Sequence, residues 1–121
     1  MGHATSFSHL ETLDTSGTTT YSKWFNVGSA VELYAYIDST ETGSANSETV
    51  AVTIERYLPY RTPVHVKILN FTTFEADATE EVIVTASEKE FGTRARFKFV
   101  TAGTWTVTNV KVYCTVFMRN R

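Results

Sequence analysis

The side chains that most often bind metals or act as acid–base catalysts are sparse in this sequence. Its three histidines are His3, His9 and His65. None of them has a second histidine or a cysteine at the short spacing of a zinc site built from one structural element. We therefore expect neither a metal nor any other cofactor.

Nucleophiles and paired carboxylates give no stronger indication of catalysis. The sequence has no Gly-x-Ser-x-Gly elbow and no phosphate-binding glycine loop. Its single cysteine, Cys114, alternates in phase with Val112 and Val116, which predicts a small buried hydrophobe rather than a nucleophile. The carboxylates available for a glycosidase-type pair lie where solvated faces place them: Glu32, Asp38, Glu55, Glu80 and Glu81. The chain is therefore not expected to be an enzyme.

Arg94, Arg96 and Lys98 form the best candidate for a nucleic-acid site, because three cations on one strand face could follow a phosphate backbone. Single-strand binders interleave such cations with exposed aromatic rings, whereas Phe97 and Phe99 fall on the opposite face of this strand. We expect the cations to pair with acidic residues of a neighbouring strand and predict no direct contact with nucleic acid. The acidic partners expected are Glu80, Glu81, Glu88 or Glu90.

Charge is distributed unevenly along the chain. All 13 acidic residues lie within residues 1–90, whose net charge is -8, while residues 91–121 carry six basic residues and a net charge of +6. Such a split can mark a partner-binding segment or two oppositely charged strands side by side in one sheet. The second interpretation is favoured.

Three tyrosines, Tyr34, Tyr36 and Tyr57, fall on strand faces opposite the aliphatic residues. Tyrosine joins an apolar ring to a polar tip and is enriched in binding surfaces. The three rings could form a protein interface, a second packed face or a platform for sugar stacking, and we rank these interpretations in that order.

The elements that would position these residues are β-strands. Thr, Val and Ile make up 38 of the 121 residues, and these β-branched side chains favour strands over helices. Alternating apolar positions predict strands over residues 30–38, 48–58, 64–68, 82–86, 94–100 and 110–118. We expect the first two to pair with each other, and a two-residue hairpin at Ala102-Gly103 to join the last two.

This pattern predicts one all-β domain over residues 21–121. Seven or eight short strands, each with one apolar face, favour an antiparallel β-sandwich of jelly-roll type. Residues 1–20, with Phe7, Leu10 and Leu13 as their large apolar side chains, are expected to form an extended N-terminal arm or an edge strand. One cysteine excludes an internal disulfide, and no stretch has the length and hydrophobicity of a leader or a membrane span, so we expect synthesis in a cytoplasm and no membrane partner.

The order of several motifs resembles that of small structural proteins of tailed-bacteriophage virions. The matching features are a Trp-Phe-x-Val opening at residues 24–27, a strand ending at Tyr36-Ile37-Asp38, a strand over residues 48–54, and a Gly…Arg-x-Arg-Phe…Gly-Thr pattern over residues 92–104. The resemblance covers about residues 20–117. Proteins with this pattern include head-decoration (cement) proteins and other minor virion components.

The resemblance implies a decoration protein on the outer surface of a phage head, made in the host cytoplasm. Its partners would be the major capsid protein and, in a homotrimer, further copies of itself. The contact residues that we expect are Phe7, Leu10, Leu13, Trp24, Phe25, Tyr34, Tyr36, Tyr57, Arg119 and Arg121. A tail or neck component is the alternative within the virion, and a carbohydrate-binding β-sandwich module is the alternative from another class.

Overall fold

A computed structural model describes residues 4–14, 19–39, 49–58, 65–71, 78–85, 91–102 and 109–120. All regular structure in these ranges is β-strand. The strands are β1 (Ala4–Asp14), β2 (Thr19–Tyr21), β3 (Phe25–Asn26), β4 (Ala30–Ser39), β5 (Thr49–Tyr57), β6 (His65–Asn70), β7 (Ala78–Thr85), β8 (Arg94–Ala102) and β9 (Asn109–Asn120). Within these ranges, no helix has the length and apolar character needed to cross a membrane.

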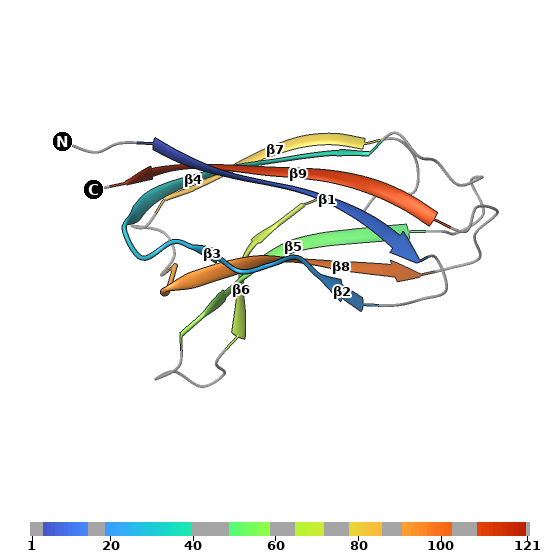
Figure 1. The fold of residues 1–121 in the computed structure, drawn as a ribbon, viewed down its shortest axis with the longest axis horizontal. Coiled ribbons are helices and arrows are strands. Elements are labelled where there is room, and N and C mark those ends of the chain that lie inside the picture. The colour runs from blue at the N-terminus through green and yellow to red at the C-terminus, as the bar shows by residue number, and fades with distance from the viewer. Residues whose placement is uncertain are drawn as a thin grey trace.

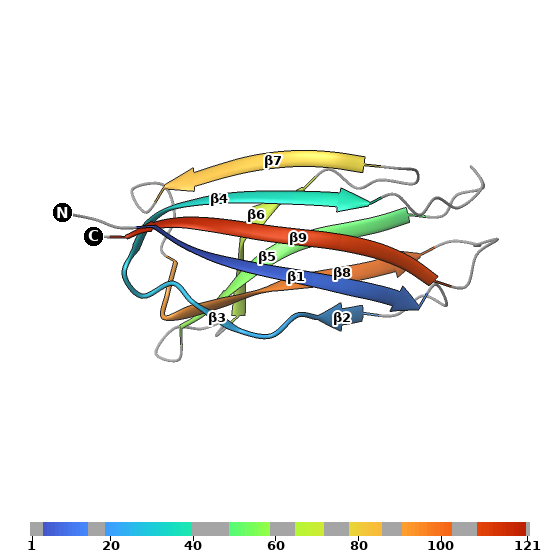
Figure 2. The same cartoon turned by 45° about the horizontal axis from the view of Figure 1, so that its top comes forward.

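The strands form two antiparallel sheets that pack face to face, as Figures 1 and 2 show. The four-stranded sheet has the order β1-β9-β4-β7. The five-stranded sheet has the order β2-β8-β5-β6, and its fifth strand, β3, also pairs with β8, nearer than β2 to the start of that strand. The predicted all-β sandwich is confirmed. The short strands β2 and β3 were not predicted, because three and two residues are too few to establish an alternation.

The core lies between the two sheets and follows the alternation of the sequence. From the four-stranded sheet it receives side chains of β4 and β9, and from the five-stranded sheet those of β5 and β8. The fully buried members include Leu33, Ala35, Ile37, Val112, Val116, Val50, Val52, Ile54, Phe97 and Phe99. Burying these apolar side chains is the main favourable contribution to folding. Every second residue of the same strands is thereby turned toward an outer face.

Neither the expected strand pair nor the expected hairpin is present. β4 pairs with β7 and β9 in one sheet, while β5 pairs with β6 and β8 in the other. β8 and β9 are likewise divided between the two sheets, although Gly103 of the expected turn lies outside the described residues. Alternation identifies the buried face of a strand but not its hydrogen-bonded neighbour, and in a sandwich consecutive strands can cross from sheet to sheet while burying the same core.

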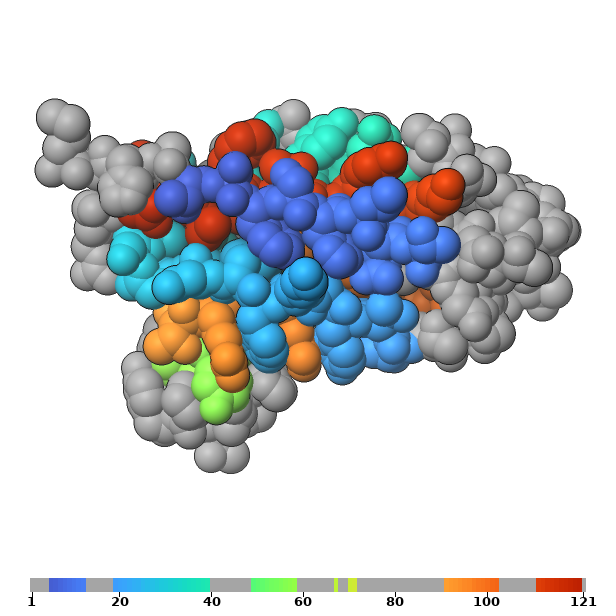
Figure 3. All heavy atoms as spheres, in the orientation of Figure 1, coloured from blue at the N-terminus to red at the C-terminus, as the bar shows by residue number. Residues whose placement is uncertain are grey.

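Residues 4–14 form an edge strand rather than an arm that leaves the domain. β1 pairs with β9 over its whole length, from Ala4 opposite Arg119 to Asp14 opposite Asn109. Figure 3 shows β1 lying along one side of the sandwich, beside the segment that contains β2 and β3. Phe7 turns toward this segment, and its ring stacks on Phe25 with a centroid distance of 4.6 Å. The edge strand therefore helps to close the side of the core.

Candidate functional site

The outer face of the five-stranded sheet carries a row of alternating arginines and aromatic rings, the arginine–aromatic ladder of Tyr21, Arg96, Trp24, Arg94 and Tyr57. The Cζ atom of Arg96 lies 3.8 Å from the ring centroid of Tyr21 and 4.3 Å from that of Trp24. The Cζ atom of Arg94 lies 4.9 Å from the Trp24 centroid and 4.3 Å from the Tyr57 centroid. These are favourable cation–π distances.

Strand β8 supplies both arginines because its alternate residues fill the core. Ala95, Phe97 and Phe99 are buried, so Arg94 and Arg96 must point outward. The rings come from neighbouring strands: Tyr57 lies directly opposite Arg94 on β5, and Tyr21 ends β2. The aromatic residues that interleave with the cations were therefore absent from β8 itself, which is why the sequence pattern did not predict the ladder.

Trp24 is positioned by an interruption between β2 and β3. The hydroxyl of Ser22 accepts a hydrogen bond from the backbone N–H of Phe97 at 2.9 Å and donates one to the carbonyl of Lys23 at 2.9 Å. The Ser22 side chain thus takes the place of a backbone carbonyl as the acceptor for this N–H group of β8. Trp24 follows this local break and lies over the outer face, while Phe25 returns to the core.

Gly92 brings the start of β8 close to the end of β5. Its φ of 75° is a left-handed conformation that glycine tolerates, and a Cβ atom there would lie only 2.5 Å from the Tyr57 carbonyl oxygen. The same oxygen accepts hydrogen bonds from the N–H of Thr93 at 3.2 Å and from its hydroxyl at 3.4 Å. This close approach places Arg94 against the Tyr57 ring.

The two arginines of the ladder have different electrostatic partners. Arg96 donates from Nε to Glu55 Oε1 at 2.8 Å, and its Nη2 atom lies 2.7 Å from the same oxygen. Arg94 is exposed, and no acidic side chain of the described residues lies within ion-pair distance of it. The expected pairing with Glu80 or Glu81 is wrong, because β7 belongs to the other sheet; Glu88 and Glu90 lie outside the described residues.

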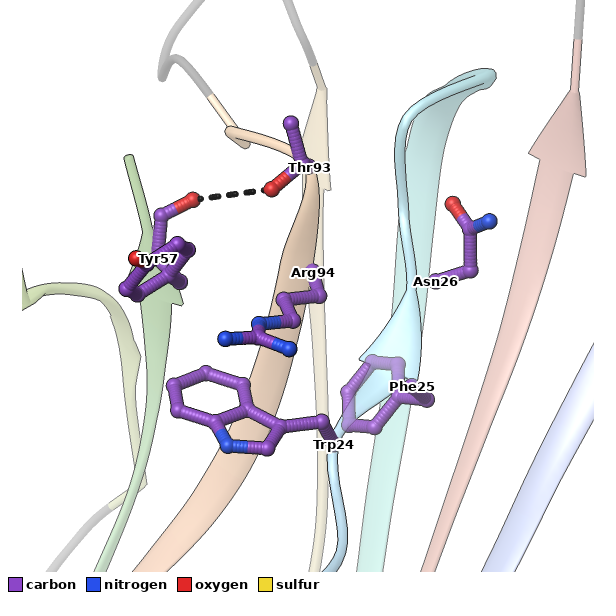
Figure 4. A pocket seen from close by; sticks show the side chains of 6 residues that line it. All are labelled: Trp24, Phe25, Asn26, Tyr57, Thr93 and Arg94. Atoms are coloured by element: carbon purple, nitrogen blue, oxygen red, sulfur yellow. Dashed lines mark hydrogen bonds between the residues drawn. The ribbon is translucent and has the colours of Figure 1, made fainter. Parts of the chain in front are cut away.

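A shallow pocket opens beside Arg94, as Figure 4 shows. It has a volume of about 470 Å³, and its lining consists of Trp24, Phe25, Asn26, Tyr57, Thr93 and Arg94. None of these described lining residues is acidic. The Asn26 side-chain oxygen accepts a hydrogen bond from the N–H of Gly28 at 2.8 Å, which holds the Asn26 amide at the rim. We call this hollow the Arg94 pocket.

The outer face of the four-stranded sheet is built differently. Leu10, Tyr113 and Phe117 are 45%, 52% and 52% exposed. Leu10 lies opposite Tyr113 in the β1–β9 pairing, and Tyr34 lies opposite Phe117 in the β4–β9 pairing with ring centroids 6.3 Å apart. This exposed aromatic face has no arginine stacked on its rings among the described residues.

The expected contact residues are divided between these surfaces. Tyr34 and Tyr36 lie on the outer face of the four-stranded sheet and Tyr57 on that of the five-stranded sheet, so the three tyrosines do not form one patch. Phe25 is only 6% exposed and packs against Phe7 and Phe97, which places it beneath the surface that a partner would meet.

Among the remaining expected contact residues, the structure places Leu10 and Arg119. Leu10 is on the exposed aromatic face, and Arg119 is exposed with its Nε 3.8 Å from Glu32 Oε1. The Leu13 side chain and all of Arg121 lie outside the described residues. Tyr113 and Phe117 were missed, although the alternation of the last strand already placed them opposite Cys114 and Val116.

The cysteine thiol and the possible metal ligands were the other groups considered for chemistry. Cys114 is buried in the core as predicted, and burial, reinforced by the negative charge of Glu11, raises the pKa of its thiol far above the ordinary value. Within the described ranges, no three histidine, cysteine, aspartate or glutamate residues gather as metal ligands.

Comparison with known proteins identifies the fold but no family. No protein-family model matches the sequence, and no curated protein matches it. PirA has the same fold with a TM-score of 0.58 at 14% identity, over 92% of each chain. The structure of infectious bursal disease virus Gt strain matches 99% of this chain and 33% of its own chain, with a TM-score of 0.56 at 9% identity.

A second structure of that virus, the Gx strain, matches 100% of this chain and 38% of its own chain, with a TM-score of 0.51 at 10% identity. This chain therefore spans little more than a third of the virus chains that it matches. At such identities the likeness concerns the fold alone, since one fold serves many functions.

Proposed function

We propose that this chain is a structural protein of a virion, and specifically a decoration protein that binds the outside of a head where major capsid subunits meet. The observation that carries the proposal is the exposed aromatic face of the four-stranded sheet. Large contiguous apolar patches are rare on proteins that remain alone, and their usual role is to be covered by another protein.

Contacts on this face would be made by Tyr113, Phe117 and Leu10, with Tyr34 packed beside them. Exposed aromatic rings are the commonest source of binding energy in protein interfaces. Self-association into a trimer would bring several copies of the face against neighbouring capsid subunits, so that modest contacts would combine by multivalency. The β-sandwich that the chain shares with a virus chain is compatible with this role.

A carbohydrate-binding module is less well supported than a structural protein. The planar platform that it would need from Tyr34, Tyr36 and Tyr57 is split between opposite outer faces of the sandwich. Within the virion, a tail or neck component would use the same exposed aromatic face, so the location of the protein distinguishes it from a decoration protein.

Immunogold electron microscopy of purified particles tests the location. Particles from the source of this sequence are labelled with an antibody against the chain. Label over the heads supports the decoration protein, and label confined to tails or necks supports the alternative. Particles that carry no label would contradict both.

A binding assay tests the surface. Purified chain is incubated with heads that lack it, and the protein that sediments with the heads is measured. Tyr113→Ser is expected to weaken binding by about tenfold or more, because it removes one of the two most exposed rings of the face. Tyr21→Ser is the matched control, since Tyr21 is a comparably exposed tyrosine (42%) on the opposite outer face. Equal binding of the two variants would contradict the assigned surface.

A further inference from the structure

The guanidinium of Arg94 is held in place without being neutralised by any described residue. Its Cζ atom lies 4.9 Å from the Trp24 centroid and 4.3 Å from the Tyr57 centroid, and these two rings meet edge to face at 69°. The close approach at Gly92 fixes the backbone from which Arg94 extends. Contact with aromatic rings holds a guanidinium in place but does not neutralise its charge. Arg94 is exposed, so it keeps N–H donors available to an oxyanion.

The surroundings of Arg94 favour a negatively charged ligand. The described residues that line the Arg94 pocket include no acidic side chain, and the amide of Asn26 adds a neutral polar group at its rim. Arg96, the other arginine of the ladder, is already paired with Glu55. Arg96 thus links β8 to β5 through Glu55, whereas Arg94 is available to a ligand.

The same geometry argues against two other ligand classes. A neutral sugar stacks on an open aromatic face, whereas the Trp24 ring is in contact with both guanidiniums of the ladder. Nucleic acid is bound mainly through many phosphate contacts, whereas the protein has a net charge of -2 and one of the cations of this face is neutralised by Glu55. A single carboxylate matches one stacked arginine better.

We propose that the Arg94 pocket binds a glutamate or aspartate side chain in an acidic segment of a partner protein. The carboxylate would lie in the plane of the Arg94 guanidinium and accept two parallel hydrogen bonds, while the apolar part of the segment would rest against Trp24 and Tyr57. This pocket is on the opposite outer face from the exposed aromatic face. The two surfaces could be occupied together, and the proposal stands or falls without the virion assignment.

Nuclear magnetic resonance of the indole N–H of Trp24 tests the proposal directly. Trp105→Phe removes the only other tryptophan of the sequence, so one indole signal reports on the pocket in the full chain. The probes are a short blocked peptide of alternating glycine and glutamate, the same peptide with glutamine, inorganic phosphate, and a short oligothymidylate, all at constant ionic strength. The glutamate peptide is expected to shift the signal saturably, and the glutamine peptide is expected to leave it unchanged.

Three variants distinguish recognition by the paired N–H donors of Arg94 from attraction to any positive charge on this face. Arg94→Lys keeps the charge but loses the two parallel donors, and we expect it to weaken binding of the glutamate peptide by about fivefold or more. Arg94→Gln should abolish saturable binding. Lys98→Gln removes one cation from the same face of the same strand, outside the pocket lining, and should bind as the parent does.

Several results would overturn the proposal. They are equal shifts with the glutamate and glutamine peptides, unchanged affinity in Arg94→Lys, an equal loss in Lys98→Gln, or saturation by oligothymidylate or phosphate at lower concentration than by the glutamate peptide. Each variant must give the amide spectrum of the folded parent, which separates loss of the site from loss of the fold. Binding of heads by Arg94→Gln is measured in parallel, because a peptide failure with intact head binding rejects only this pocket.

Discussion

The two outer faces of the sandwich carry similar aromatic side chains that differ in whether an arginine contacts them. On the five-stranded sheet, Tyr21, Trp24 and Tyr57 are stacked with Arg94 and Arg96. On the four-stranded sheet, Tyr113 and Phe117 are about half exposed with no such cover among the described residues.

The difference shows that residue type alone does not make a binding surface. Rings stacked with guanidiniums contribute to the stability of the chain that contains them, because their contacts are already made in the isolated molecule. Half-exposed rings contribute little to that stability and can gain contacts only from another molecule. Matched substitutions on the two faces should therefore have unequal effects on unfolding and unequal effects on the binding of heads.

The largest effect is expected where the ladder is anchored to the backbone. Gly92→Ala should lower the free energy of unfolding by about 3 kcal/mol, because it forces a side chain into a left-handed conformation and against the Tyr57 carbonyl oxygen. Urea unfolding measures the change. Gly28→Ala is the control, because an added Cβ there would lie 3.3 Å from the Asn26 side-chain oxygen and 3.9 Å from the Thr93 carbonyl oxygen, with no left-handed backbone to strain. It should cost less than about 1 kcal/mol. Equal losses would show that Gly92 has no special role.

The next effect compares a covered ring with an exposed one. Trp24→Leu should lower the free energy of unfolding by about 2 kcal/mol, since it removes contacts with two guanidiniums. Phe117→Leu, on the other face, should change it by less than about 0.5 kcal/mol, as is usual for exposed positions. Chemical denaturation of both variants provides the measurement. A cost for Phe117→Leu as large as that for Trp24→Leu would remove the proposed difference between the faces.

The two ion pairs offer a smaller version of the same comparison. The side chains of Arg96 and Glu55 are 17% and 11% exposed, whereas those of Arg119 and Glu32 are 63% and 36% exposed. Glu55→Gln should therefore cost about 1.5 kcal/mol, and Glu32→Gln less than about 0.5 kcal/mol. Thermal unfolding at low and high salt separates the pairs further, because only the exposed pair is strongly screened. Similar costs would mean that burial does not distinguish them.

The smallest expected effect belongs to the core that both faces share. Burial raises the pKa of the Cys114 thiol, so only the unfolded chain releases this proton as the pH passes the ordinary thiol pKa of about 8.5. Stability due to the neutral thiol is complete below that pH and falls above it, by about 1 kcal/mol at pH 9.5. Cys114→Val should lack this part of the alkaline loss. Parallel alkaline profiles of parent and variant would contradict the assignment.

The sequence predicted which strand faces are buried and failed to predict which strands are neighbours. The alternation of Phe97 and Phe99 with Arg96 was sufficient to place the arginine outside, because a pleated strand has only two faces. The partner of Arg96 proved to be Glu55 rather than a residue of β7, since pairing depends on how the chain crosses between sheets. The arginine–aromatic ladder depends on three such neighbours, so no single segment of the sequence contained its signal.

The exposed aromatic face could have been found earlier than the ladder. Tyr113 and Phe117 lie two positions either side of Thr115 in one strand, and their phase opposite Cys114 was already evident. What the sequence could not provide was the exposure of these rings, because an outward-facing residue can still be covered by a loop or a second sheet. The structure supplies that information for Tyr113 and Phe117.

Hydroxyl-radical footprinting of the chain, free and bound to particles, tests the central claim most directly. The account predicts that Tyr113 and Phe117 are oxidised readily in the free chain and are protected on the particle, while Tyr21, on the opposite outer face, reacts at similar rates in both states. Unchanged oxidation of Tyr113 and Phe117 on the particle would show that the exposed aromatic face is not the surface by which this protein is held.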